Sequence, residues 1–286
     1  MVQLREISKK SRNFACESRS GSAKLAADMS AAVRYDAEGP VGVITLDRPD
    51  NRNSMTPELL DAFAVASTAA RADASVRVVV VTGTGSCFSS GADFKSTLQR
   101  THGAPHERSY AMYAPFLSLL DLDVPVIGAL NGHTVGGGFG LALVCDLRIG
   151  AEHAKYGANF VKLGLAPGMA ISYMLPRIVG LPRANELLLT GRLVDGIEAA
   201  SLGILNRAVA ADAVMATAMG LANTIAANAP IAVRETKRAI RRGLQLAIRE
   251  AAHAESYAQA ETVITDDARE GIAALLAKRD PIFSGR

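Results

Sequence analysis

The fold of this chain is constrained most by two runs of apolar and β-branched residues. Each run leads directly into a glycine-rich segment. Residues 76–82 precede the segment 83–93, and residues 125–130 precede the segment 131–140. Short apolar runs of this kind are typical of strands buried on both faces of a parallel sheet. Glycine lets a ligand approach the backbone closely, so we expect the two segments to be loops that contact a ligand.

Helical patterns separate these strands and then dominate the second half of the chain. Thr56, Pro57 and Glu58 form a helix start, with threonine as the N-cap, proline in the first turn and a carboxylate near the positive end of the helix dipole. We expect a further strand at 41–47 and helices at 56–71, 105–120, 136–145, 211–228, 230–242 and 244–264. The alternation predicts an α/β core over residues 31–210 and a helical C-terminal region over residues 211–286.

Composition narrows the class of protein. Among the 286 residues 49% are apolar and the formal net charge is +3, which is typical of a globular protein and lacks the basic field that recruits nucleic acid. No apolar run approaches the roughly 20 residues that a membrane-spanning helix needs. Three cysteines are too few for a disulfide framework, which favours a reducing, cytoplasmic location. Residues 1–30 contain no apolar signal sequence and are expected to form a mobile tail.

The glycine segments do not match the common nucleotide-binding or hydrolase motifs. The pattern Gly83-x-Gly85-x-x-Phe88 lacks the third glycine of a dinucleotide fingerprint, and the segment 131–140 lacks the lysine and hydroxyl residue of a P-loop. Neither segment contains the Gly-x-Ser-x-Gly pattern of a nucleophile elbow. Each segment alone could be a structural turn, so the pair is the more informative feature.

Several stretches of the sequence combine into a recognisable pattern. They are, in chain order, Ile44-Thr-Leu-Asp-Arg-Pro49, Asn53-Ser-Met55, Phe88-Ser-Ser-Gly-Ala-Asp-Phe94, Pro125-Val-Ile-Gly-Ala-Leu-Asn-Gly132, Gly136-Gly-Gly138, Cys145-Asp-Leu-Arg148 and Leu163-Gly-Leu-Ala-Pro-Gly168. With these residues the chain resembles the crotonase family, the enoyl-CoA hydratase/isomerase superfamily, from about residue 33 to residue 283. The resemblance implies a spiral of ββα turns, a helical C-terminal trimerisation region, and homotrimers or dimers of trimers.

The resemblance also implies an acyl-CoA thioester as ligand, with coenzyme A as part of the substrate and no separate cofactor. In such proteins two backbone N–H groups hold the thioester oxygen, and by motif position these belong to Ala92 and Gly137. Preorganised donors of this kind stabilise the negative charge that develops on the oxygen of an enolate. The positions implied in substrate binding are Arg52, Ser54, Ser90, Asp93, Phe94, Thr134, Gly136 and Asn159.

The chain departs from the family at the two acid/base positions. Hydratases of the family carry a glutamate three residues after the second oxyanion residue, where this chain has Gly140, and another where it has Phe160. Each general acid or base typically contributes a factor of about 10²–10⁴. No aspartate or glutamate lies between Glu152 and Glu186, so a shifted alignment restores no carboxylate. We expect altered or weak hydratase chemistry; the alternative is a non-catalytic acyl-CoA carrier or sensor.

Other groups near these positions have both a functional and a structural interpretation. His106, Glu107 and Tyr110 fall where the family has a variable lid, so they could reach the substrate or form a solvated surface. His133 could titrate at the site or orient the second glycine segment. The pair His102 and His106 has no evident third ligand, so no metal site is expected.

Overall fold

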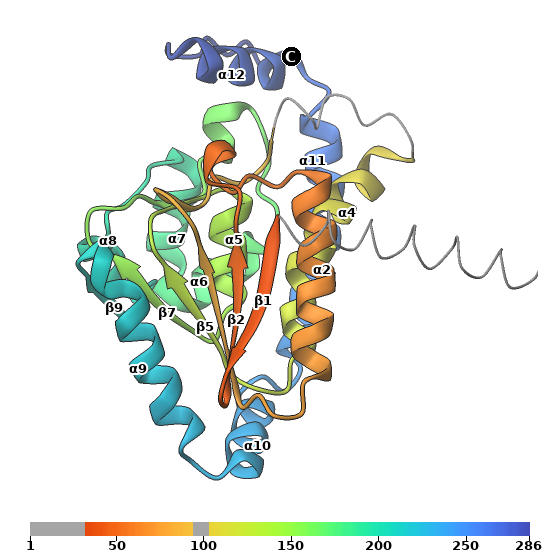
Figure 1. Ribbon diagram of the computed structural model, residues 1–286. Helices are drawn as coiled ribbons and strands as arrows, with labels where there is room; N and C mark the ends of the chain where they lie inside the picture. The colour runs from red at the N-terminus through yellow and green to blue at the C-terminus, as the bar shows by residue number, and fades with distance from the viewer. Residues whose placement is uncertain (1–31, 94–102) are drawn as a thin grey trace, which may run out of the picture.

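A six-stranded sheet forms the centre of the molecule. The computed structural model describes residues 32–93 and 103–286. The sheet has the order β1-β2-β3-β5-β7-β9, in which β1 is antiparallel to β2 and the other neighbours are parallel (Figure 1). Its strands are β1 (Val33–Glu38), β2 (Val41–Leu46), β3 (Val78–Gly83), β5 (Val126–Leu130), β7 (Leu147–Ala151) and β9 (Arg207–Val209). The α/β class predicted from the sequence is confirmed.

The central strands are buried because helices cover them. All four valines of β3, Val78 to Val81, are fully buried, as their unbroken apolar run predicts. Helix α2 (Pro57–Ala72) packs against β1 and β2, and α9 (Val214–Ala226) packs against β3, β5 and β7. Thr56 begins α2 as predicted, because its hydroxyl accepts a hydrogen bond from the Leu59 N–H at 3.3 Å.

A second, three-stranded parallel sheet takes two of its strands from the segments predicted to be loops. Its strands are β4 (Cys87–Ser89), β6 (His133–Val135) and β8 (Tyr156–Gly157), in the order β4-β6-β8. The loop prediction for 83–93 and 131–140 was therefore wrong in part. Strands this short leave no periodicity to read, and the surrounding glycines argue against strand structure. A Cβ atom at Gly132 would lie 2.1 Å from the carbonyl oxygen of Ser86, so the close pairing requires glycine there.

Helices make up most of the remaining described chain. They are α4 (Pro105–Leu117), α5 (Gly137–Val144), α6 (Ile171–Val179), α7 (Leu181–Thr190), α8 (Gly196–Ser201), α10 (Pro230–Ile240), α11 (Leu244–Thr262) and α12 (Asp266–Ala277). The helical C-terminal region is present, although its boundary at residue 211 and its role in trimerisation stay predictions. None of the helices described here is both long and apolar enough to cross a membrane. The tail predicted at 1–30 lies outside the described residues.

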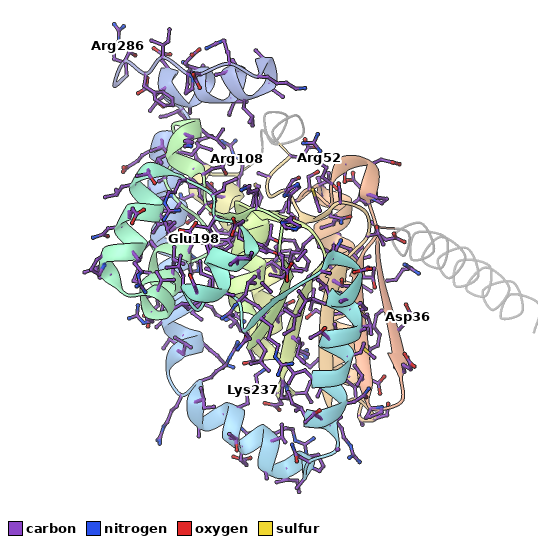
Figure 2. All side chains as sticks on the ribbon, turned by 90° about the vertical axis from the view of Figure 1, so that its left-hand side faces the viewer. Asp36, Arg52, Arg108, Glu198, Lys237 and Arg286 are labelled. Atoms are coloured by element: carbon purple, nitrogen blue, oxygen red, sulfur yellow. The ribbon has the colours of Figure 1, made fainter. Side chains whose placement is uncertain are left out.

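A buried ion-pair cluster ties the C-terminal region to the sheet. Asp146 stands between α5 and β7, and its carboxylate lies 3.0 Å from the Lys237 Nζ atom and 2.7 Å from the Arg241 Nε atom. The same carboxylate accepts a hydrogen bond from the Val126 N–H at 2.8 Å. Burial lowers the pKa of Lys237. The cluster holds α10 at one end of the molecule (Figure 1), where Figure 2 labels Lys237.

Candidate functional site

A cavity of about 660 Å³ lies beside the two glycine segments. Strands β3 and β5 both run toward it, because each glycine segment follows the carboxyl end of its strand. Seven of the residues predicted from the sequence line this cavity, namely Arg52, Ser90, Ala92, Gly136, Gly137, Asn159 and Phe160. Residues distant in sequence therefore meet here, as ligand sites in open α/β sheets do at strand carboxyl ends.

The two predicted donor amides lie side by side in the cavity wall. A Cβ atom at Gly91 would lie 2.9 Å from the Gly137 nitrogen, so the chain before Ala92 touches the start of α5. A Cβ atom at Gly137 would lie 2.2 Å from the Met55 Sδ atom, so a larger residue there would displace the buried Met55 side chain. Across the described parts of the chain, neither the Ala92 nor the Gly137 N–H has a hydrogen-bond acceptor. Both groups can therefore donate to a ligand, and the Gly137 N–H adds the positive end of the α5 dipole.

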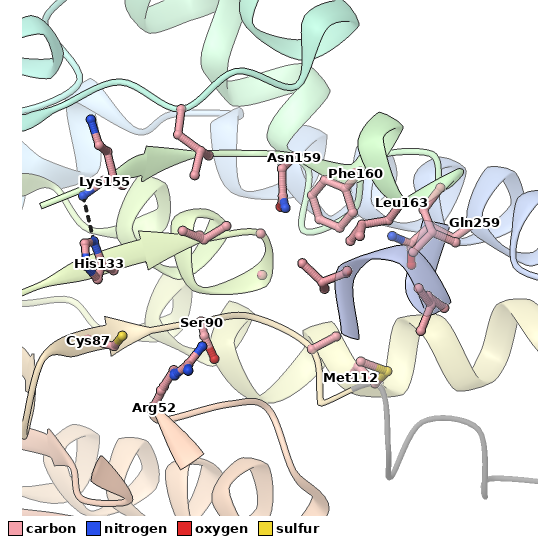
Figure 3. Close-up of a pocket in the computed structure, with 18 of the residues that line it drawn as sticks. Arg52, Cys87, Ser90, Met112, His133, Lys155, Asn159, Phe160, Leu163 and Gln259 are labelled. Carbon is pink, nitrogen blue, oxygen red and sulfur yellow. Dashed lines mark hydrogen bonds between the residues drawn. The ribbon is translucent and has the colours of Figure 1, made fainter. Parts of the chain in front are cut away.

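One half of the cavity is polar and cationic. Figure 3 shows Arg52, His133 and Lys155 on the same side as Cys87 and Ser90. The His133 Nδ1 atom accepts a hydrogen bond from the Lys155 N–H at 3.0 Å, which fixes the imidazole and leaves Nε2 to face a ligand or water. This half is suited to an anionic group.

Asn53 is a positioning residue for this polar half. Its side chain is fully buried, accepts a hydrogen bond from the Arg48 N–H at 2.8 Å, and donates to the carbonyl oxygens of Thr84 and Cys87 at 3.0 and 2.9 Å. Both Arg52 and Asn53 have positive φ angles, of 60° and 52°. The buried amide thus holds a left-handed turn that presents Arg52 to the cavity.

The other half of the cavity is apolar. Its wall combines Met112 of α4 with Phe160 and Leu163, which Figure 3 shows together on the side away from His133. Val263, directly after α11, and Ile272 and Leu275 of α12 complete it. Sequence reasoning missed these three, because nothing in a C-terminal amphipathic helix indicates which distant loop it covers. Asn159 lies between the two halves.

Gln259 is the polar side chain of α11 at the apolar end. Its Oε1 atom accepts a hydrogen bond from the Tyr113 hydroxyl, and its Nε2 atom donates to the Ala166 carbonyl at 3.0 Å. These bonds hold both ends of the amide in place, so the side chain forms part of the cavity wall.

The two positions that lack glutamate differ in the structure. Phe160 lines the cavity, and its ring lies 4.0 Å from where a Cβ atom of Gly136 would stand. Gly140 is buried and does not line it, since a Cβ atom there would lie 2.3 Å from the Met169 Cβ atom and 2.9 Å from its Cγ atom. Met169 is fully buried and has a φ angle of +63°. The structure therefore has no room for any side chain at position 140.

The remaining predicted residues lie outside the cavity lining. Ser54 and Thr134 are buried, and the Thr134 hydroxyl donates to the Gly132 carbonyl at 2.9 Å, which is a structural role. Asp93 is half-buried next to the lining residue Ala92. Phe94 falls outside the described residues.

None of the lid candidates His106, Glu107 and Tyr110 lines the cavity. Glu107 accepts a hydrogen bond from the Ala104 N–H at 2.9 Å, and the other two pack against α11. The His106 ring stacks on Tyr257 at a centroid distance of 4.2 Å, and the Tyr110 ring stacks on His253 at 3.7 Å. Neighbouring positions of α4, Ser109 and Met112, line the cavity in their place. His102 lies outside the described residues.

Glu255 is a buried carboxylate that sequence reasoning did not single out. Its Oε1 atom accepts hydrogen bonds from the Ser172 N–H at 2.8 Å and the Ser172 hydroxyl at 2.5 Å, so it caps the start of α6. Burial raises its pKa. Burial, together with this carboxylate, also raises the pKa of Tyr113. Glu255 thereby anchors the turn that carries Met169.

The two sheets, the cavity between the glycine segments and the C-terminal helices define the crotonase class of α/β proteins. The structure of carnitinyl-CoA hydratase from Mycobacterium avium matches with a TM-score of 0.80 at 33% identity, over 90% of this chain and 99% of that one. A probable enoyl-CoA hydratase of Mycobacterium leprae, echA8, is 35% identical over 254 residues, which cover 89% of this chain and 98% of that protein. A short-chain-enoyl-CoA hydratase of Clostridium acetobutylicum is 34% identical over 86% of this chain and 95% of that protein.

The family assignment follows from the sequence match. The enoyl-CoA hydratase/isomerase family model covers residues 36–286. The chain belongs to this family, as its motifs indicated.

Proposed function

We propose that the protein binds an acyl-CoA thioester and stabilises negative charge on the thioester oxygen, with weak or altered hydratase chemistry. The observation that carries this proposal is a pair of amides, Ala92 N–H and Gly137 N–H, that find no acceptor among residues 32–93 and 103–286. They lie in one wall of a cavity with a cationic half and an apolar half. The cationic half suits the phosphates of coenzyme A, and the apolar half suits the acyl chain. Coenzyme A is then part of the substrate, and no further cofactor is needed.

The amides favour reactions that pass through an enolate or a tetrahedral oxyanion. Donors fixed in the backbone need no reorganisation when charge develops, and the loss of one such donor typically costs a factor of about 10²–10³. Abstraction of a proton next to the thioester, decarboxylation and thioester hydrolysis all develop charge at this oxygen. The amides alone do not distinguish these reactions.

Hydration requires groups that the cavity lacks at the family positions. Phe160 supplies no proton, and Met169 fills the space beside Gly140. Without an acid and a base, hydration loses about 10²–10⁴ for each missing group. A water held by Asn159 is the route we expect for any residual hydratase activity.

The second candidate is a non-catalytic acyl-CoA carrier or sensor. The favouring observation is Phe160, which makes the wall beside the amides apolar where family hydratases carry a carboxylate. Assembly into homotrimers or dimers of trimers stays part of the proposal. The exposed apolar side chains of Leu276 and Ile282 support contact with further copies.

Isotope-edited infrared spectroscopy tests the thioester contact directly. Butyryl-CoA labelled with ¹³C at the carbonyl is bound to the protein, and we expect its carbonyl band to shift to lower wavenumber, since two N–H donors polarise the bond. A thioether analogue of butyryl-CoA lacks the carbonyl and should bind at least tenfold more weakly, which corresponds to about 1.4 kcal/mol. An unshifted band together with equal affinity for the thioether would refute the contact.

Mass spectrometry in ¹⁸O water then separates the two candidates. Enoyl-, acyl- and malonyl-type thioesters are incubated with the protein, and each mixture is also filtered to score retained ligand. Incorporated oxygen, lost carbon dioxide or released coenzyme A identifies the reaction and excludes the carrier. Ligand retained unchanged across the panel supports the carrier and excludes hydratase activity on these substrates.

A further inference from the structure

A second cavity, of about 540 Å³, lies at the other end of the molecule from the amide pair. It is formed by α10, the start of α11 and the segment that leads into β5. In this cavity Lys237 donates a hydrogen bond to the Val124 carbonyl, which lies just before the amino end of β5. The glycine segments of the first cavity instead follow the carboxyl ends of β3 and β5. Figure 2 shows Arg52, which lines the first cavity, and Lys237, which lines the second, at opposite ends of the fold.

The lining of this second cavity is strongly cationic. Five cationic side chains contribute to it, namely Arg234, Lys237, Arg238, Arg241 and Arg242. The lining also contains two acidic side chains, Asp123 and Glu235, and both form ion pairs with Arg238. The Asp123 Oδ1 atom lies 3.6 Å from the Arg238 Nη2 atom. Within residues 32–93 and 103–286, neither Arg234 nor Arg242 has an acidic partner. These two guanidinium groups therefore face the cavity uncompensated.

The buried floor of the cavity also carries excess positive charge. Lys237 and Arg241 are both more than nine-tenths buried, with 7% and 9% of their surfaces exposed, and they share one counter-charge, the carboxylate of Asp146. The Arg241 Nη2 atom donates to the Val144 carbonyl at 2.6 Å, but its Nη1 atom is buried without any hydrogen-bond partner in the described chain. An uncompensated buried cation is costly, and an anion in contact with the group removes that cost.

We propose that this cavity is a binding site for a phosphoryl dianion, either inorganic phosphate or a phosphomonoester. The five cations exceed the three acids Asp123, Glu235 and Asp146 by two charges, which matches the charge of a dianion. Arginine predominates among the cations, and its planar fork is the group best suited to phosphate oxygens. The proposal is independent of any activity at the first cavity.

The test measures phosphate binding to the full-length protein by ³¹P line broadening and by calorimetry, at about pH 8, where a phosphoryl group is mainly dianionic. The test variant combines Arg234→Gln with Arg242→Gln and leaves the buried pairs intact. We expect its dissociation constant for inorganic phosphate to rise about tenfold, since two exposed charge contacts are lost. A parallel titration with methyl phosphate shows whether a phosphomonoester binds as well as the free ion.

Two control variants locate the site. Arg71→Gln combined with Arg183→Gln removes the same charge from exposed positions elsewhere and should leave the constant unchanged. Lys155→Gln, in the first cavity, should also leave it unchanged. The proposal is overturned if the wild-type protein binds no phosphate, if the Arg234 and Arg242 double variant binds as tightly as wild type, or if the loss appears with Lys155→Gln instead.

Discussion

Replacing Gly140 by alanine places a methyl group where Met169 already stands. The new Cβ atom would lie 2.3 Å from the Met169 Cβ atom, well inside van der Waals contact, and both residues are buried in the same core. Overpacking of this kind costs about 1–3 kcal/mol. Alanine gains about 1 kcal/mol over glycine within a helix, so we expect Gly140→Ala to lower the free energy of unfolding by up to about 2 kcal/mol.

The matched partner substitution is Met169→Gly. It removes a fully buried side chain at a cost of about 2–5 kcal/mol. It also relieves the left-handed backbone, since glycine adopts a φ angle of +63° without the roughly 1–2 kcal/mol penalty of other residues. In the double variant the methyl group at position 140 enters the vacated space. The two effects should therefore couple favourably by about 2 kcal/mol.

Urea unfolding of the wild type, the two single variants and the double variant measures this coupling. Gly220→Ala is the control, because Gly220 lies within α9 and a Cβ atom there would meet nothing within 4 Å. This control should raise stability by about 1 kcal/mol. The reasoning fails if the effects of the two single substitutions add up to that of the double variant within about 0.5 kcal/mol. It also fails if Gly140→Ala raises the free energy of unfolding.

Three further predictions concern side chains of the core and the cavity. Asp146→Asn leaves two buried cations without their counter-charge and should cost about 3–5 kcal/mol in urea unfolding, whereas Asp123→Asn at an exposed pair should cost at most about 1 kcal/mol. Burial raises the pKa of Glu255 above 4.5, so the native state binds more protons than the unfolded chain above that pH, and stability falls as pH rises through this window. The Glu255→Gln variant should lack this share of the decline in urea midpoints as the pH rises above 4.5. Phe160→Glu places a carboxylate in the apolar wall and should therefore weaken butyryl-CoA binding about tenfold or more in calorimetry. The control variant Phe160→Leu keeps the wall apolar and should bind nearly as tightly as wild type.

Each of these three has an outcome that contradicts its reasoning. If Asp146→Asn and Asp123→Asn lowered the free energy of unfolding equally, burial would not determine how much an ion pair contributes to stability. Parallel pH dependence of Glu255→Gln and wild type would mean that this carboxylate titrates as in the unfolded chain. Unchanged affinity in Phe160→Glu would place the acyl chain elsewhere.

The sequence was a good guide where local chemistry decides structure. The N-cap Thr56 with Pro57 specifies the start of α2 through a single turn, and the valine run 78–81 specifies a buried strand through its own composition. The helix after Gly136 was also predicted, because an apolar run follows the glycines directly. These features depend only on neighbouring residues, so no tertiary information was needed.

The parts that the sequence could not supply depend on contacts between distant residues. Strands β4 and β6 exist because their backbones pair with each other, not because Cys87 or His133 favours strands. That Met169 occupies the space beside Gly140, 29 positions earlier, follows from packing alone. The apolar contribution of Ile272 likewise depends on where α12 docks. Motif position nevertheless brought seven predicted residues to the lining of one cavity.

The ion pairs of Asp146 also have a consequence for the synthesis of the chain, because they join residues far apart in the sequence. Its cationic partners lie far along the chain, Lys237 within α10 and Arg241 directly after it. At roughly 5–20 residues per second, a ribosome needs roughly 5–20 seconds to translate the stretch between residues 146 and 241. Throughout that interval the nascent α/β region carries a carboxylate at the start of β7 without its partners. The buried ion pairs can therefore form only after all six strands of the main sheet, β9 included, have been synthesised.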